Sequence, residues 1–247
     1  MAQIIIVASF PRSGTHFTID VLRNAFPALR ARKKYLEPNA YVYGDLDRLL
    51  QAERRFLYRL ESILNKRGGL LFKTHKYAGG DIFFKGDLPH FIPFIKKHFP
   101  MAEIKVVYVE RDLIATLRSY FAFYRSALRG SSELEEFLFD DSGAVDSVLE
   151  HRKGWAQYSA TPILSISYEG LRDDPLKTSI ELSGFLGMQE DLHFSMPSAL
   201  KSVGQSRFNQ IFCRDPPATT ILGGGTSSVK FSDSIVARIR DLENASQ

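Results

Sequence analysis

Continuous apolar runs alternate along this chain with segments in which apolar positions recur every three or four residues. The first run, Ile4–Ala8, is rich in β-branched residues and has no polar break, which is typical of a strand buried on both faces. After a short loop, apolar residues recur with helical spacing at Phe17, Val21, Leu22 and Ala25. The first 26 residues therefore predict a strand, a tight loop and a helix.

Three later apolar runs predict further strands, at residues 70–72, 104–109 and 163–166. Helical patterns predict helices at residues 45–66, 91–98, 113–127, 176–186 and 233–242, with two more between 131 and 158. Residues 27–44 and 77–89 lack such a pattern and are interpreted as loops. Alternating strands and helices imply an α/β fold with a parallel sheet covered on both faces, and ligands are expected at the carboxyl ends of its strands.

The loop after the first strand is predicted to bind an anion. A strand-to-helix loop points backbone N–H groups and the positive end of a helix dipole at one spot, and Arg12 adds a permanent positive charge there. The phosphate-loop signature G-x-x-x-x-G-K-S/T is absent, because Gly14 is the only glycine of the loop and no Lys-Ser or Lys-Thr follows it. This disfavours an ordinary ATPase or kinase.

Two stretches resemble a known family. The loop SFPRSGTHF, residues 9–17, resembles that of sulfotransferases that use 3′-phosphoadenosine-5′-phosphosulfate (PAPS), which commonly reads like PKSGTTW or PRSGTT. The stretch LLFKTHK, residues 70–76, is similar to the strand-end LLKTH of cytosolic sulfotransferases, whose histidine is the catalytic base. The lysine two positions earlier also lies at the transfer site in that family. The resemblance therefore implies a base, His75, and an assisting cation, Lys73.

Two more stretches extend the resemblance to the nucleotide. In KVVYVERDLIATLRSYFAFY, Arg111 and Ser119 match the arginine and serine, eight positions apart, that hold the 3′-phosphate of PAPS in the family. A guanidinium can bind phosphate oxygens bidentately, and a hydroxyl can add a neutral donor. SYEGLRDDP is similar to the family's YEDLKEDP, whose tyrosine hydrogen-bonds the adenine and corresponds to Tyr168. In SVLEHRKGWAQY, His151 and Trp155 are interpreted as packing residues.

The last fifth of the chain departs from the family. Where relatives carry a loop like RKG-x-x-GDWK that binds the 3′-phosphate, residues 221–230 read ILGGGTSSVK. Gly224 and Lys230 match, but Leu222 and Gly223 replace the basic pair and Val229 replaces the tryptophan. A glycine-rich loop can still present amides to phosphate, although a flexible linker is an alternative interpretation.

The implied chemistry moves a sulfuryl group from PAPS to an acceptor hydroxyl or amine and leaves adenosine 3′,5′-bisphosphate, with no metal required by the motifs. Arg12 would stabilise the 5′-phosphate and the leaving oxygen, and Phe17 would stack on adenine. The catalytic residues are then His75, Arg12 and Lys73. The resemblance places these residues at the cofactor: Arg12, Ser13, Gly14, Thr15, His16, Phe17, Arg111, Ser119, Tyr168, Gly224 and Lys230.

Composition agrees with one folded domain over residues 1–247. Apolar residues make up 44% of the chain and charged residues 24%, as in globular proteins. The resemblance adds that the α/β fold is a P-loop-NTPase-like, three-layer one. No early segment is apolar enough for a membrane span or has the pattern of a signal peptide, and the single cysteine, Cys213, suits a reducing compartment, so a cytoplasmic location without membrane insertion is expected.

The net charge of +4 fits nucleic acid, an acidic membrane surface or an anionic ligand. Basic residues are scattered apart from a cluster at residues 30–34, so an anionic ligand is favoured and no nucleic-acid partner is expected. The acceptor is interpreted as a small molecule or carbohydrate. That cluster hints at an acidic acceptor, whereas aromatic side chains hint at an apolar pocket: Tyr77, Phe83, Phe84, Phe121 and Tyr124.

Two alternatives stay open. A nucleoside or small-molecule kinase would share the fold, although the missing phosphate-loop lysine argues against it. A nucleotide-binding module without catalysis is the second alternative, suggested by the altered glycine loop. The oligomeric state is not encoded in any pattern found here.

Overall fold

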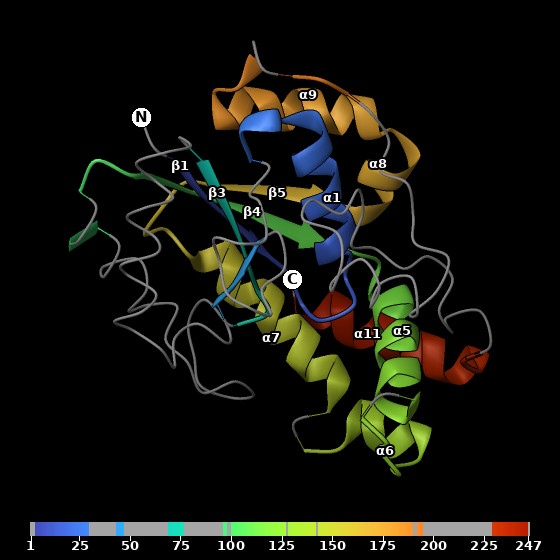
Figure 1. The fold of residues 1–247 in the computed structure, drawn as a ribbon. Helices are drawn as coiled ribbons and strands as arrows, with labels where there is room; N and C mark the ends of the chain where they lie inside the picture. Colours follow the sequence, from blue (N-terminus) through green and yellow to red (C-terminus); the bar gives the residue numbers. More distant parts are fainter. Residues whose placement is uncertain are drawn as a thin grey trace.

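A central parallel sheet organises the molecule (Figure 1). The structure is a computed structural model that describes residues 3–29, 43–46, 69–76, 96–97, 100–126, 128–141, 143–189, 192–194 and 229–246. In the described part of the chain the sheet has five strands, in the spatial order β2 (Gly44–Asp45), β3 (Gly69–Thr74), β1 (Gln3–Ala8), β4 (Glu103–Glu110) and β5 (Ile163–Ser167). The N-terminal strand β1 is thus the middle strand.

The strand register brings the carboxyl ends of β1, β3 and β4 to one edge. Ala8, the last residue of β1, pairs with Thr74 on β3 and with Tyr108 on β4. β4 continues two residues further, to Glu110. The segments that follow these three strands therefore start beside one another, which is where α/β sheets bind ligands.

Helices cover both faces of the sheet (Figure 1). One layer contains α1 (Thr15–Ala25), α8 (Tyr168–Asp173) and α9 (Pro175–Leu186), and the short 3-10 helix η1 (Pro27–Leu29) follows α1. The other contains α5 (Leu113–Ser126), α6 (Leu134–Phe139), α7 (Ala144–Gln157) and α11 (Asp233–Ala245). The predicted three-layer α/β architecture, of the P-loop-NTPase-like class, is confirmed.

The core explains why β1 has no polar break. Ile5 and Val7 pack in a buried cluster with α1 and α9, whereas their neighbours Ile4 and Ile6 are equally buried. Because successive strand residues point to opposite faces, both faces of β1 are covered, as its sequence predicts. A second apolar cluster joins α5, α6, α7 and α11. This cluster fixes α11 against the rest of the molecule.

Several element boundaries differ from the prediction, and two of these differences involve β3. The strand predicted at residues 70–72 continues through Thr74, because the backbones of Lys73 and Thr74 pair with β1 although their side chains are polar. Asp45, predicted to begin a helix, lies in β2 and pairs with Lys73. The other predictions for residues 30–42, 47–68, 77–95 and 195–228 lie outside the described residues. No helix in the described part is long and apolar enough to cross a bilayer.

Candidate functional site

The loop between β1 and α1 is built to leave helix amides for an outside anion. Gly14 is the N-cap residue of α1 and, having no side chain, offers the first amides no capping oxygen; the first turn of α1 contains no acidic residue. Arg12 and Gly14 both have left-handed backbones, with φ of 72° and 105°. Such a conformation is uncommon for a residue with a side chain and concentrates at binding sites. The loop therefore resembles an anion site in backbone as well as in sequence.

Tyr168 explains why position 14 is glycine. A Cβ atom on Gly14 would lie 2.3 Å from Cδ2 of the Tyr168 ring, which is far inside van der Waals contact. Phe17 meets the same ring edge-on, with ring centroids 6.0 Å apart. The guanidinium of Arg111 lies 4.7 Å from the Tyr168 ring centroid in a cation–π contact. Tyr168 thus packs against both the loop and Arg111.

Two arginines converge on the loop. Arg111 donates from Nη1 to the backbone carbonyl of Arg12 at 3.0 Å, and Arg12 donates from Nε to the hydroxyl of Ser119 at 3.3 Å. The pKa of Arg12 is lowered by burial and then by the positive charge of Arg111. Among the described residues neither guanidinium forms an ion pair with a carboxylate. A bound anion would relieve this repulsion.

Helix α5 supports the loop from the side. Ser119 is only 2% exposed, and Thr116, one turn earlier, is fully buried with its hydroxyl 3.5 Å from that of Ser13. Within the loop, the hydroxyls of Ser9 and Thr15 are 2.5 Å apart. The sequence prediction missed Thr116, although its i, i+3 spacing to Ser119 puts both on one helix face.

His75 follows β3 and extends the pairing of β3 with β1 by a side-chain bond. The amide of Ser9 donates to the Thr74 carbonyl at 3.2 Å, and Nδ1 of His75 then donates to the Ser9 carbonyl at 2.9 Å. Because a carbonyl oxygen only accepts, Nδ1 carries the proton and the neutral ring has its lone pair on Nε2. This is the tautomer that a general base needs at Nε2.

His16 lies close to the cations of the site and remains neutral. Its Nε2 is 2.8 Å from the hydroxyl of Tyr43, a buried residue that the sequence prediction missed. The pKa of His16 is lowered to about 3, chiefly by burial. Positive charge on Lys73, on His75 when it is protonated, and on Arg12 contributes to this shift, so each of these side chains lies within electrostatic reach of His16. A histidine with that pKa is a weak base at neutral pH.

Residues of α7 contact the segment that follows β3 and the neighbouring strand β4. The indole Nε1 of Trp155 donates to the carbonyl of Lys76 at 3.1 Å, and Nδ1 of His151 is 3.0 Å from the Tyr108 hydroxyl. The pKa of His151 is lowered to about 3, first by burial and then by the positive charge that His75 carries when it is protonated. His151 and Trp155 are both 1% exposed, which confirms their interpretation as packing residues.

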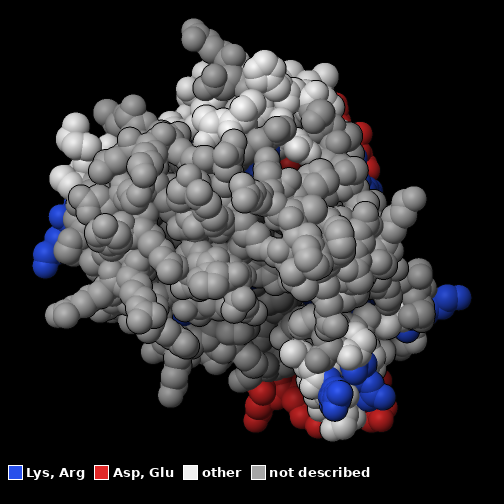
Figure 2. Space-filling view, in the orientation of Figure 1, with Lys and Arg blue, Asp and Glu red and all other residues white. Residues whose placement is uncertain are grey.

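Exposed charges of both signs lie together elsewhere. Figure 2 shows acidic and basic side chains gathered at the end of the molecule where α6 lies. The acidic residues there include Glu135 and Glu136, and Arg125 and Arg129 are exposed nearby in sequence. Opposite charges at this end reduce its net field. In the described part, no group of three or more His, Cys, Asp or Glu residues is arranged to hold a metal ion.

Comparison with known proteins decides the family. A family model described as "Sulfotransferase domain" matches residues 3–201. The chain belongs to this sulfotransferase family. It is 30% identical to mouse sulfotransferase 1A1 over 190 residues, covering 74% of this chain and 59% of that protein, and 24% identical to the dog sulfotransferase 1A1, with 74% and 58% covered. The sulfotransferase chain thus spans less than two thirds of the length of these relatives.

Solved structures support the sulfotransferase fold. One is retinol dehydratase in a complex with retinol and adenosine 3′,5′-bisphosphate (PAP), with a TM-score of 0.53 and 18% identity over 98% of this chain and 80% of that one. Another is a sulfotransferase from Alicyclobacillus acidocaldarius, with a TM-score of 0.50 and 13% identity over 82% and 87% of the two chains. At these identities the likeness concerns the fold alone.

The sulfotransferase fold gathers most of the predicted site residues at one edge of the sheet. Lys230 is exposed, next to Phe231, whose ring packs under Arg118, and Gly224 lies outside the described residues. Phe121 and Tyr124 pack with Phe137 of α6. The residues brought together by the strand ends and the loop are Arg12, Ser13, Gly14, Thr15, His16, Phe17, Lys73, His75, Arg111, Ser119 and Tyr168.

Proposed function

We propose that this chain transfers the sulfuryl group of PAPS to a hydroxyl or amine of a small-molecule or carbohydrate acceptor by in-line displacement. The observation that carries the proposal is the pairing of Arg12 and Arg111 beside the amino end of α1, with Ser119 bonded to Arg12. PAPS carries phosphate at both the 3′ and the 5′ position. Two guanidiniums at a helix amino terminus fit such a ligand, because each can bind one phosphate with charge-assisted hydrogen bonds.

Each end of the donor would meet different residues. The 5′-phosphosulfate would lie on the amides of Gly14 and Thr15, where the helix dipole and Arg12 stabilise the negative charge that grows on the leaving oxygen. The amide of Ser13, expected at the same place, instead donates to the carbonyl of Phe10 at 3.1 Å. The 3′-phosphate would bind Arg111 and Ser119. Tyr168, which touches both Gly14 and Arg111, would define the space for adenine between these two ends.

His75 would take the acceptor proton. As the acceptor oxygen attacks sulfur, the bond between sulfur and the 5′-phosphate oxygen breaks and PAP leaves with that electron pair, while the acceptor proton moves to Nε2 of His75. The hydrogen bond from Nδ1 to Ser9 holds the lone pair on Nε2 before transfer and supports the imidazolium afterwards. Lys73, whose positive charge contributes to the lowered pKa of His16, would add positive charge near this point.

Ligand binding gives the direct test. Isothermal titration with PAP, AMP and ATP should show PAP binding at least tenfold more tightly than AMP, because AMP leaves Arg111 without an anion. Arg111→Ala should remove most of that difference while AMP binding changes little. Arg125→Ala, which removes an exposed arginine from the far end of α5, is the matched control and should keep it. Equal affinities of the unmodified protein for PAP and AMP would contradict the proposal.

Turnover separates an enzyme from a binding module. The protein should release PAP from PAPS in the presence of a phenol, alcohol, amine or sugar acceptor. PAP binding without turnover on any of these classes would favour the catalytically inactive module, and transfer from ATP with magnesium would favour the kinase.

A further inference from the structure

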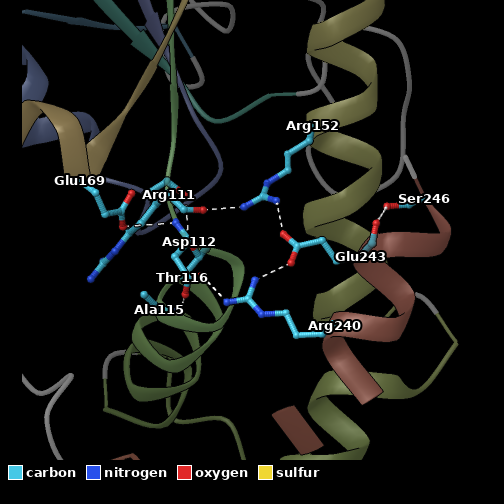
Figure 3. A network of polar contacts seen from close by, with 10 residues as sticks. Arg111, Asp112, Ala115, Thr116, Arg152, Glu169, Arg240, Glu243 and Ser246 are labelled. Atoms are coloured by element: carbon cyan, nitrogen blue, oxygen red, sulfur yellow. Dashed lines mark hydrogen bonds and ion pairs between the residues drawn. The ribbon is translucent and has the colours of Figure 1, made fainter. Parts of the chain in front are cut away.

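The backbone of Arg111 is held by a network that ends on α11. Nη2 of Arg152, on α7, donates to the Arg111 carbonyl at 2.5 Å. Nη1 of Arg152 pairs at 2.8 Å with Oε1 of Glu243, on α11 (Figure 3). The carbonyl that Arg152 holds belongs to the residue whose side chain faces Arg12 and Tyr168. The placement of Arg111 therefore depends on a contact with α11.

Glu243 connects this contact to a second one. Its Oε2 accepts from Nη1 of Arg240 at 2.5 Å, and Nη2 of Arg240 pairs with Oδ2 of Asp112 at 2.6 Å. Asp112 follows Arg111 in the chain, so the network leaves the backbone at Arg111 and returns to it one residue later (Figure 3). Such a closed ring restricts the peptide between the two residues more than either contact could alone.

Asp112 also joins two elements of the site. Its Oδ1 accepts from the amide of Ala115 at 2.8 Å and so caps the start of α5, and its own amide donates to Glu169 at 3.3 Å. Burial raises the pKa of Asp112, but hydrogen bonds from Arg240 and Ala115 and positive charge on Arg240 and Arg152 lower it by more. The carboxylate is therefore ionised and directed to Arg240, while the guanidinium of Arg111 lies over Tyr168.

We propose that Glu243 and Arg240 are positioning residues that set Arg111 for the 3′-phosphate of the nucleotide. This inference rests on the proposed function. The family model matches residues 3–201, so both residues lie beyond its match, on α11. Without them, Asp112 loses its partner and its carboxylate competes with the phosphate for Arg111, the cation next to it in the chain.

The effect has a specific signature. Arg111 would meet only the 3′-phosphate, which PAP has and AMP lacks. A loosened Arg111 should therefore lower the affinity for PAP and leave the affinity for AMP unchanged. A general loss of structure would lower the affinity for both ligands. The ratio of the two affinities thus separates positioning from stability.

Glu243→Gln is the first variant to measure, because it keeps the shape of the side chain and removes the charge that joins Arg152 to Arg240. PAP affinity should fall about tenfold, the effect of losing one well-placed charged hydrogen bond, with AMP affinity unchanged. In turnover, the KM for PAPS should rise with little change in kcat. Asp241→Asn, on the same helix and outside the network, removes the same charge and should leave both affinities unchanged.

Arg240→Ala and a matched control variant give a second, independent test. Arg240→Ala should lower the PAP-to-AMP affinity ratio, and Arg238→Ala, which removes an arginine that packs over Phe139, should not. Arg240→Lys should recover only part of the ratio, since a lysine cannot hold Asp112 and Glu243 with one planar fork.

The outcomes separate this inference from the proposed function. If the unmodified protein does not prefer PAP to AMP, the proposed function is wrong and the inference fails with it. Two other results would mean that α11 does not position Arg111, while the proposed function stands. Either the preference for PAP over AMP stays unchanged in Glu243→Gln and Arg240→Ala, or the affinities for both ligands fall equally.

Discussion

The two sides of β1 support the same loop with opposite chemistry. On the β4 side, Arg111 is held by a ring of ion pairs whose outer pair, Arg240 and Asp112, is 44% and 37% exposed. On the β3 side, buried neutral side chains support the segment that carries His75: Trp155 bonds the carbonyl of Lys76, and His151 lies near His75. Both supports come in part from α7, so one helix serves a charged site and a neutral one.

The difference follows from what each side would do. The β4 side would bind a phosphate and therefore needs a full positive charge. Charged, partly exposed partners can orient a guanidinium there without a large desolvation cost. A side that takes a proton needs a base whose charge changes during the reaction. The two neutral histidines next to His75, the half-buried His16 and the buried His151, avoid further positive charge that would oppose its protonation.

The largest expected effect is on the β3 side. His75→Ala should lower kcat about a hundredfold or more, the usual contribution of a positioned base, while PAP still binds. His193→Ala, at an exposed histidine beyond α9, should leave turnover unchanged. Steady-state kinetics with PAPS and titration with PAP measure the two quantities separately. Turnover near the original level in His75→Ala would remove the functional contrast between the two sides.

The next expected effect is the pH dependence of stability. His16 and His151 have pKa values of about 3 in the folded protein against about 6.5 when unfolded. Between these values the unfolded chain binds protons that the folded one does not. Above pH 6.5 the two histidines should therefore cause no change in the free energy of unfolding with pH. As the pH drops from 6.5 towards 3, the free energy of unfolding should fall by up to about 1.4 kcal/mol per pH unit for each histidine.

Urea denaturation at several pH values measures this slope. His151→Gln should make it shallower, and His193→Gln, at the exposed control position, should not. An equal slope in the unmodified protein, His151→Gln and His193→Gln would show that His151 binds a proton as readily in the folded protein as in the unfolded chain.

A smaller effect is expected where the two sides meet at the loop. Gly14→Ala would need a Cβ 2.3 Å from the Tyr168 ring at a φ of 105°, so the unfolding free energy should fall by about 1–3 kcal/mol and PAP should bind less tightly. Gly184→Ala is the matched control, because that glycine lies in α9 with open space around it. It should stabilise the protein by about 0.5–1 kcal/mol. Equal effects of the two substitutions would show that Tyr168 moves aside.

The smallest expected effect is that of the ion-pair ring on stability. Arg240→Ala should change the unfolding free energy by less than about 1 kcal/mol, because partly exposed pairs contribute little. Urea denaturation at neutral pH, with Arg238→Ala alongside, measures it. A loss of more than about 2 kcal/mol would mean that the ring chiefly stabilises the fold, and the contrast between the two sides would then need another explanation.

Local patterns were enough to predict much of the fold. The β-branched run of β1 and the apolar run of β4 predict their strands because burial on both faces leaves a nearly continuous signal. β5 is predicted from a short apolar run, although only Ile166 of this strand is buried. β3 was predicted too short, since Lys73 and Thr74 have polar side chains and their pairing is through the backbone. The resemblance predicted that Arg111 binds the same nucleotide as the loop, and in the structure Arg111 lies against the loop.

The supports of the site could not be predicted in the same way. Tyr43 bonds a histidine 27 positions earlier, and Arg240 bonds a carboxylate 128 positions earlier. Such contacts depend on how helices pack, which no local pattern encodes. Charged residues such as Arg152 and Glu243 also resemble any solvated helix surface in the sequence.

The same long separations affect the order in which the molecule assembles. Arg240 and Asp112 are 128 positions apart, against 100 for the paired residues of β1 and β4, and contacts that close longer stretches of chain form later in folding. The strands and the loop can therefore reach nearly native positions before α11 docks and completes the ring at Arg111. Added PAP should then slow unfolding of the native protein strongly and accelerate refolding little, because a ligand that needs the finished ring finds no binding partner in earlier intermediates.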